Sequence, residues 1–424
     1  MFFLLFFFFS TASAQTTLLK SGPMVGYSTQ TEVLIWVQAT SESKVQVRYR
    51  KKNSKEIFLN SVAEITRKDK GYTSKLKIGN LEPSSRYDYE LLINDNKISF
   101  NYPLEFQTNS TDTIHDFKVA IGSCAIFTGD TTVTHIYESI ASKKPDMMLW
   151  LGDNIYLDAT DWDSVQNIMK KYTANRSLVQ LQPLLAATHH YAIWDDHDYG
   201  PDNSDSSFYN KKISREAFEN FWANPSFGID GRGVTTSFSW NDVDFFLLDD
   251  RYNRAPDSER SRTKPYLGPS QINWLMTSLK KSKARFKLIV LGNQLINKMP
   301  FEKENYSSYK QEQKSLFRQI KDSGIEGILF ITGDRHFSEI SRMKRRGTYP
   351  FYDLTVSPLT STAITTRLNF NTRRVRKSLI RKRNFAVLEF CGSGTERVMK
   401  INYFDTQGSL LYQNVICADY LKNQ

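Results

Sequence analysis

Residues 191–200 read Tyr-Ala-Ile-Trp-Asp-Asp-His-Asp-Tyr-Gly, an apolar run followed at once by three carboxylates and one imidazole. The apolar run predicts a buried strand, and the Pro-Asp-Asn-Ser-Asp sequence of residues 201–205 predicts a loop. Such a density of negative charge at the end of a buried strand is costly unless a cation neutralises it. The stretch therefore predicts a cluster of metal ligands at the end of a strand.

Five further apolar runs share this pattern, and each is followed by a turn or a small residue with polar, mostly ligand-type side chains. The runs are residues 117–121, 147–151, 243–248, 286–291 and 328–331, and they precede Gly122-Ser123-Cys124, Gly152-Asp153-Asn154-Ile155-Tyr156, Asp249-Asp250-Arg251, Gly292-Asn293-Gln294 and Gly333-Asp334-Arg335-His336. Helical patterns at 132–142, 214–222, 270–283 and 311–323 separate them, which indicates an α/β sheet covered on both faces. Because ligands bind beyond the carboxyl ends of strands in such sheets, we expect six strand ends to form one rim.

The region before these runs has a different texture. Residues 32–39, 44–50 and 72–78 read as strands, the last two alternating with a period of two residues, and Leu81 and Pro83 ahead of Tyr87 form the pattern of a tyrosine corner. We therefore predict a fibronectin-like β-sandwich over 18–110, without catalytic residues.

The first residues indicate export. Residues 1–9 are a methionine followed only by Phe and Leu, too few to span a bilayer, which takes about 20 residues. Ala12-Ser13-Ala14 resembles the A-x-A cleavage site of signal peptidase, so we expect a signal peptide over 1–14 and a periplasmic or secreted protein. In an oxidising compartment Cys391 and Cys417 pair if their strands are neighbours, and Cys124 is left over, either as a metal ligand or as a buried apolar residue.

The composition and net charge limit the classes of partner that the protein is expected to bind. Among 424 residues, 56 basic and 45 acidic side chains give a net charge of +11, and a hydrophobic content of 40 % argues against disorder. Much of the excess lies in residues 367–383, which is either a binding surface or a solvated segment. For residues 349–362 three roles stay open: a lid over the site, a rim that attracts phosphate, or no functional role. We predict no specific nucleic-acid partner, no transmembrane segment and a monomer.

The strand ends supply a distinctive set of donors. The candidate ligands are Cys124, Asp153, Tyr156, Asp196, Asp334 and His336. This mixture suits a dinuclear centre with a bridging carboxylate, and its thiolate and phenolate favour Fe(III) beside a harder cation. Such a centre activates water for attack on phosphorus. His197 is placed to protonate the leaving group or to contact phosphate, and Arg251 and Arg335 to bind phosphate oxygens, although Asp249–Arg251 is equally readable as a buried ion pair.

These motifs, together with the Gly-Pro-Ser-Gln-Ile-Asn-Trp-Leu sequence of residues 268–275, resemble the PhoD-like alkaline phosphatases and phosphodiesterases of the calcineurin-like metallophosphoesterase superfamily. The resemblance implies a four-layer α/β/β/α catalytic domain over 116–424 behind the β-sandwich. It implies a ferric ion held by Cys124, Asp153, Tyr156 and His336. It further implies calcium or another divalent ion near Asp153, Asp196 and Asp334.

The remaining polar residues take supporting roles in this interpretation. His197 occupies the position of the superfamily's catalytic histidine. We expect Asp195, Asp198, Asn154 and Arg335 to orient the ligands or to contact phosphate. The predicted function is an exported, metal-dependent phosphoric ester hydrolase acting on small-molecule or lipid phosphate esters. The alternatives are a phosphodiesterase or phospholipase on lipid or nucleotide diesters, and a non-enzymatic surface-binding protein with a structural metal site.

Overall fold

A computed structural model describes residues 17–110, 114–297, 303–365 and 370–423. The predicted signal peptide, residues 1–14, lies outside the described residues. Within the described part of the chain, no helix is long and apolar enough to cross a membrane.

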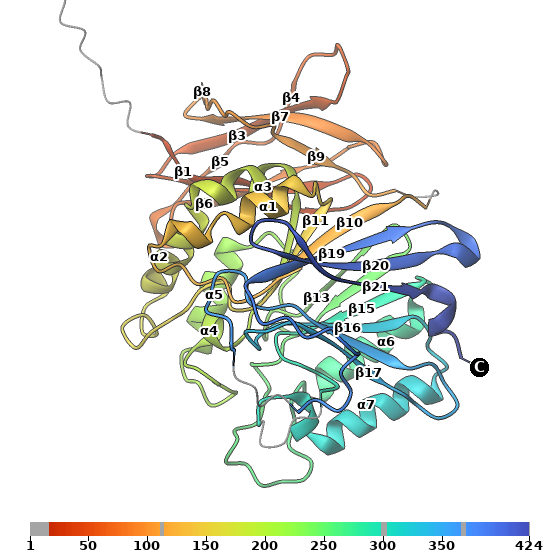
Figure 1. Cartoon of the computed structure of the whole chain (residues 1–424). Coiled ribbons are helices and arrows are strands. Elements are labelled where there is room, and N and C mark those ends of the chain that lie inside the picture. The colour runs from red at the N-terminus through yellow and green to blue at the C-terminus, as the bar shows by residue number, and fades with distance from the viewer. Residues whose placement is uncertain (1–16, 111–113, 298–302, 366–369, 424) are drawn as a thin grey trace, which may run out of the picture.

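The N-terminal region is an all-β domain of two packed sheets, in the red and orange part of Figure 1. One sheet has the order β1-β2-β6 and the other is built on β3 and β7, with short strands β4, β5, β8 and β9 at their sides. Their bounds are β1 Leu19–Ser28, β2 Val33–Ala39, β3 Lys44–Lys51, β4 Leu59–Asn60, β5 Glu64–Ile65, β6 Thr73–Ile78, β7 Arg86–Ile93, β8 Asn96–Lys97 and β9 Glu105–Gln107. The Tyr87 hydroxyl accepts a hydrogen bond from the Glu82 N–H at 2.8 Å, which confirms the predicted tyrosine corner.

The rest of the chain forms two six-stranded sheets, with orders β12-β11-β10-β19-β20-β21 and β13-β14-β15-β16-β18-β17. The first comprises β10 Phe117–Gly122, β11 Met147–Leu151, β12 His189–Ile193, β19 Asn384–Cys391, β20 Val398–Asp405 and β21 Leu410–Cys417. The second comprises β13 Thr236–Trp240, β14 Val243–Leu247, β15 Phe286–Val290, β16 Ile328–Thr332, β17 Glu339–Met343 and β18 Phe351–Thr355. The six predicted apolar runs are β10, β11 and β12 in one sheet and β14, β15 and β16 in the other, parallel within each set.

The two sheets pack face to face and helices cover their outer faces, so the layers run α/β/β/α (Figure 1). Helices α1 Ile136–Ser142, α2 Val165–Arg176, α3 Gln182–Ala187 and α5 Lys211–Phe221 cover the first sheet, and α6 Pro269–Lys281 and α7 Lys310–Asp322 cover the second. Side chains such as Leu149 and Leu288 meet between the sheets. Both sheets are buried on both faces, so every one of these strands is a continuous apolar run. The runs therefore do not show which sheet each strand belongs to, and from the sequence alone they suggest a single sheet.

The β-sandwich shares a core with the catalytic region. Met24 and Trp36 belong to the same buried cluster as Phe218 of α5, and the Trp36 indole N–H donates to the Asn220 carbonyl at 2.8 Å. A Cβ on Gly26 would lie 2.3 Å from the Cβ of Ala223, so glycine permits the close approach of β1. The sandwich is therefore an integral part of the packed structure.

The cysteines of the last sheet do not meet. Cys391 and Cys417 both lie opposite Val398, one on each side of β20. Two strand spacings, about 9.5 Å, then separate their backbones, which exceeds the reach of a disulfide. All three cysteines are free thiols, so the pairing of Cys391 with Cys417 considered above does not occur.

Candidate metal centre

Turn glycines allow the strand ends of the two sheets to approach closely. A Cβ on Gly152 would lie 2.5 Å from the Cβ of Asp195, and one on Gly333 would lie 2.7 Å from the Cβ of Ser123. A Cβ on Gly292 would lie 2.5 Å from the Asp195 carboxyl carbon. The expected rim therefore exists, and strands of both sheets contribute to it.

The backbone at the candidate ligands is left-handed. Cys124, Asp153, Asp334 and His336 have φ angles of 58°, 52°, 64° and 53°. Non-glycine residues adopt this region rarely and at an energetic cost, and such residues concentrate at functional sites. Four of the six predicted ligands carry this strain.

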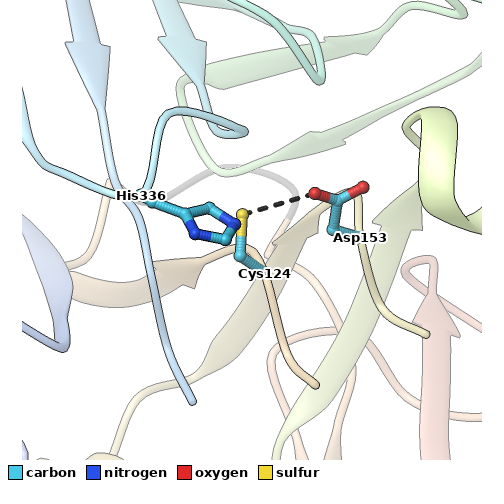
Figure 2. Close-up of side chains that lie close together, drawn as sticks. All are labelled: Cys124, Asp153 and His336. Carbon is cyan, nitrogen blue, oxygen red and sulfur yellow. Dashed lines mark hydrogen bonds between the residues drawn. The ribbon is translucent and has the colours of Figure 1, made fainter. Parts of the chain in front are cut away.

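The first ligand cluster joins Cys124, Asp153 and His336, whose ligand atoms lie within 4.8 Å of one another (Figure 2). The Cys124 thiol donates to Asp153 Oδ2 at 3.4 Å. The Tyr156 hydroxyl lies 3.4 Å from the same carboxylate oxygen and 3.2 Å from His336 Nε2. The structure thus brings together all four donors predicted around the first ion.

A loop that follows β18, residues 357–362, supports this cluster with hydroxyl and carbonyl groups. The Ser357 hydroxyl donates to Cys124 Sγ at 3.1 Å, and the Ser361 hydroxyl donates to the Tyr156 oxygen at 3.0 Å. The Thr362 carbonyl lies 2.8 Å from His336 Nδ1, so Nδ1–H donates to it and the Nε2 lone pair faces the cluster. Sequence analysis left the role of this loop open, because a serine and threonine run after a strand is common in turns.

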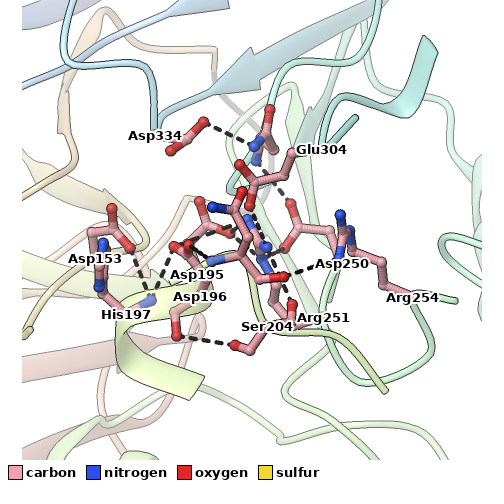
Figure 3. Close-up of polar contacts among 12 residues, drawn as sticks. Asp153, Asp195, Asp196, His197, Ser204, Asp250, Arg251, Arg254, Glu304 and Asp334 are labelled. Atoms are coloured by element: carbon pink, nitrogen blue, oxygen red, sulfur yellow. Dashed lines mark hydrogen bonds and ion pairs between the residues drawn. The ribbon is translucent and has the colours of Figure 1, made fainter. Parts of the chain in front are cut away.

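The second ligand cluster consists of Asp153, Asp195, Asp196 and Asp334, whose nearest carboxylate oxygens also lie within 4.8 Å of one another. The backbone N–H of His197 donates to Asp196 Oδ1 at 3.0 Å and to Asp153 Oδ1 at 3.3 Å (Figure 3). Asp153 belongs to both clusters. Its carboxylate could therefore contribute a ligand to an ion held in either cluster.

The short helix α4 Asp196–Tyr199 presents the second cluster. Asp195 caps it, and Asp195 and Asp198 form a reciprocal capping box with each other's backbone N–H groups. Asp198 also accepts hydrogen bonds from the Asn154 backbone N–H at 3.1 Å and from the Tyr172 hydroxyl at 3.2 Å. Asp198 and Asn154 are buried, and their hydrogen bonds hold α4 against the β11 turn.

Arg251 has a different position from the predicted one. Its side chain has no exposed surface and lies between Asp195 and Glu304, with which it forms ion pairs (Figure 3). A guanidinium enclosed in this way is an internal counter-ion to carboxylates and does not reach a phosphate in this conformation. Arg335, by contrast, is partly exposed and lies 3.1 Å from Asp334 Oδ2. Glu304 was missed, because no motif surrounds it.

The electrostatics of the site call for a cation. Burial, with the neighbouring Cys124 and Asp196, raises the pKa of Asp153 well above its usual value. Burial and the Glu304 charge raise the pKa of Asp334 to about 8, and burial and Asp334 raise the pKa of Cys124 to about 12. Burial also favours protonation of Asp196, but Arg251 and His197 outweigh it and lower the pKa. Apart from Asp196, these groups hold their protons unless a metal ion replaces them, and the donor set fits such an ion.

His197 lies at the border between the clusters and solvent. Its ring stacks on Tyr156 with centroids 4.3 Å apart, and its side chain is 22 % exposed. Nε2 lies 3.6 Å from Asp202. The imidazole is thus accessible beside both clusters, as a proton donor or phosphate contact must be.

Comparisons with known proteins agree with this fold and site. The sequence model of the PhoD-like phosphatase family matches residues 119–397, and that of a domain of unknown function, DUF7800, matches residues 16–111. A search of curated proteins gives no match. A solved structure of PhoD aligns with a TM-score of 0.79 and 16 % identity, covering 96 % of this chain and 92 % of that one. The purple acid phosphatase PPD1 of yellow lupin (Lupinus luteus) seeds aligns with a TM-score of 0.69 and 12 % identity, covering 94 % and 75 %.

The two solved structures share the fold of this chain, and the family model spans more than half of it, including all six strand ends. The chain belongs to the PhoD-like phosphatase family, and it is a metal-dependent phosphoesterase.

Proposed function

We propose that the protein is an exported phosphoric ester hydrolase of the alkaline phosphatase D type, whose two metal ions share Asp153. The observation that carries this proposal is the position of Asp153, which lies within ligand distance of a thiol, phenol and imidazole on one side and of three carboxylates on the other. Membership of a phosphatase family supports phosphate esters as the substrates.

The donor chemistry supports two different ions. Cys124, Tyr156 and His336 combine soft and strongly donating groups, which suit Fe(III). Asp196 and Asp334 offer only oxygen, which suits Ca²⁺ or another hard divalent ion. When bound, such a pair activates water and neutralises the charge that develops on the transferring phosphoryl group.

The protein's own residues complete the reaction. His197 donates a proton to the leaving alkoxide, since its ring is accessible beside both clusters. Arg335 contacts a phosphate oxygen from the rim, and Arg251 fixes Asp195 and through it the start of α4. Asn154 and Asp198 keep α4 against the β11 turn.

Elemental analysis and paired substrates test the proposal. The purified full-length chain is expected to contain iron and calcium, and to hydrolyse p-nitrophenyl phosphate or its bis ester with loss of activity on chelation and recovery on re-addition of both ions. Faster turnover of the bis ester would favour the phosphodiesterase alternative. Full metal content without turnover of either ester would support a structural metal site and would contradict the proposed activity.

Export is a separate part of the proposal. The Ala12-Ser13-Ala14 sequence predicts cleavage before Gln15. Mass spectrometry of the protein recovered from its native compartment is expected to show Gln15 as the first residue. Recovery of the intact Met1 form in the cytoplasm would contradict it.

A further inference from the structure

The net charge of the protein is concentrated in two short runs. Residues 342–346 and 373–383 contain 11 basic residues and no acidic one. Removing these 11 from the chain's 56 basic residues leaves 45, which equals the number of acidic residues. The two runs therefore account for the whole excess of +11, and the rest of the molecule is balanced.

The fold places these runs side by side. Segment 371–380 lies along the outer edge of β17, with bridges between Ser341 and Arg374 and between Ser338 and Ile380. The Arg342 N–H donates to the Arg373 carbonyl at 2.7 Å, and the Val375 N–H donates to the Ile340 carbonyl at 2.7 Å. Both segments are blue in Figure 1, next to the β17 label. We call residues 342–346 and 373–383 together the basic face.

Much of the basic face is open to solvent. Its exposed members are Arg342, Lys344, Arg346, Arg376, Lys377 and Lys382. The acidic side chain beneath it, Glu339, is fully buried and paired with Arg374. At its other end Arg383 feels the charge of Asp130, which is fully solvated. In the described part of the chain these six exposed cations form no ion pair, although Arg342 lies over the Tyr352 ring, 5.7 Å from its centroid.

Two exposed apolar residues adjoin these features, Phe370 beside the basic face and Ile364 beside the candidate metal centre. Phe370 is 65 % exposed and directly precedes segment 371–380, and Ile364 is 43 % exposed. The Ile364 N–H donates to the His336 carbonyl at 2.8 Å, which places Ile364 beside a candidate ligand. Large exposed apolar side chains next to concentrated positive charge are typical of protein surfaces that meet lipid headgroups.

We propose that the basic face, with Ile364 and Phe370, docks the protein on an anionic phospholipid surface. Basic residues near such a surface each contribute about 1 kcal/mol of attraction, and exposed apolar side chains enter the acyl boundary. Eight of the 11 basic residues are arginines, whose planar guanidinium groups bind phosphate in a bidentate manner. A phosphate polymer would use the charge but would gain nothing from exposed Ile364, so the lipid surface is the better match.

The docked orientation brings the candidate site to the membrane. His336 lies two residues before Ser338, where β17 and segment 371–380 meet, so the site borders the bound surface. Docking does not depend on catalysis. Failure of the hydrolysis assays above would leave vesicle binding intact, and failure of vesicle binding would leave hydrolysis of soluble esters intact.

Vesicle co-sedimentation tests the proposal with a matched control. The full-length chain is mixed with vesicles of phosphatidylcholine alone or with phosphatidylglycerol. The test variant combines Arg376→Glu, Lys377→Glu and Lys382→Glu. The control combines Lys280→Glu, Lys281→Glu and Lys283→Glu, three exposed lysines at the end of α6, with the same change in net charge.

The wild type is expected to bind the anionic vesicles and not the neutral ones, less so at high salt. The test variant is expected to bind roughly 100-fold or more weakly, and the control variant much as the wild type. Phe370→Ser is expected to weaken binding about tenfold, because an inserted aromatic ring is lost. Thermal unfolding and hydrolysis of soluble bis(p-nitrophenyl) phosphate are expected to be unchanged in all variants.

Three outcomes would overturn the proposal. Absence of wild-type binding to anionic vesicles would remove it directly. Equal losses in the test and control variants would show that only net charge matters. Binding of inorganic polyphosphate or single-stranded oligonucleotides, abolished by the test variant while vesicles fail to bind, would assign the basic face to a phosphate polymer instead.

Discussion

The two ligand clusters that share Asp153 differ in the groups that support them. We call them the Cys124 side, with Tyr156 and His336, and the Asp195 side, with Asp196 and Asp334. On the Cys124 side, uncharged hydroxyls contact the ligands: Ser123 and Ser357 lie against Cys124 Sγ, and Ser361 donates to Tyr156. On the Asp195 side, the buried guanidinium of Arg251 lies among Asp195, Asp250 and Glu304. Hydroxyls orient ligands without neutralising them, whereas an arginine does both.

This difference bears on how each side depends on metal. On the Asp195 side, the positive charge of Arg251 neutralises part of the carboxylate charge and helps to keep Asp196 ionised. The Cys124 thiol and the Tyr156 phenol have pKa values raised above normal, by burial first, and become ligands only when an ion displaces their protons. We therefore expect binding on the Cys124 side to release protons and to be the more pH-dependent of the two.

Substitution of the shared residue is expected to have the largest effect. Asp153→Ala removes a ligand from both ions and is expected to lower kcat roughly 10⁴-fold with loss of both metals. It also removes a buried carboxyl that lies beside Asp195, Asp196 and Asp334, so the metal-free variant should unfold at a higher temperature than metal-free wild type. Activity, metal content and thermal unfolding measure these effects. Asp158→Ala, at a solvated position, is the control, and full activity of Asp153→Ala would refute the bridge.

His197→Asn tests the residue that borders both sides. Loss of a proton donor is expected to lower kcat by about 10²- to 10⁴-fold for esters with poor leaving groups, and much less for p-nitrophenyl esters, whose leaving group needs little protonation. Metal content is measured alongside, because a His197 ring nitrogen lies within 4.8 Å of ligand oxygens of Asp153 and Asp196, and unchanged content would exclude a ligand role for the ring. His135→Asn, at an exposed position, serves as control. An equal loss for all leaving groups would point to phosphate binding.

Arg251→Met distinguishes the two sides most directly. It leaves Asp195 and Glu304 buried without their cation and is expected to lower the free energy of unfolding by about 3–5 kcal/mol. Urea denaturation measures it, and Arg335→Met, at a partly exposed pair, is expected to cost about 1 kcal/mol or less. Equal costs for the two variants would mean that Arg251 is not the main counter-charge of its side.

Ser361→Ala is expected to have the smallest effect. The Tyr156 oxygen loses one hydrogen bond, which is worth about 1 kcal/mol, and metal affinity on the Cys124 side should fall about tenfold. Competition with a chelator measures the affinity of each ion separately. Thr365→Ala, an exposed position in the same part of the chain, is the control. A loss of affinity confined to the divalent ion proposed near Asp196 and Asp334 would contradict the assignment of Ser361 to the Cys124 side.

The sequence predicted those features that leave a local mark. Apolar runs ending in Gly-Ser-Cys, Gly-Asp or Asp-Asp-His predicted the β10, β11, β12 and β16 ends, because burial and turn geometry act within a few residues. The division into two sheets came from the family resemblance, since strands buried on both faces look alike. Arg251 was expected either to bind phosphate or to form a buried ion pair, and only three-dimensional packing shows that Asp195 and Glu304 enclose it. The support from Ser357 and Ser361 depends on long-range contacts that no local pattern records.

The core shared by the sandwich and the catalytic region has a consequence for biosynthesis. The ribosome releases β1 and β2 before any strand of the catalytic region. The apolar surface around Met24 and Trp36 therefore stays exposed to solvent until α5, against which it packs, has been synthesised. Conversely, a chain truncated to begin near residue 114 would complete its sheets but leave the Asn220 carbonyl and the surface of Ala223 that Gly26 contacts uncovered. Expression of that fragment alone should yield aggregates, and co-expression with residues 15–113 should rescue it.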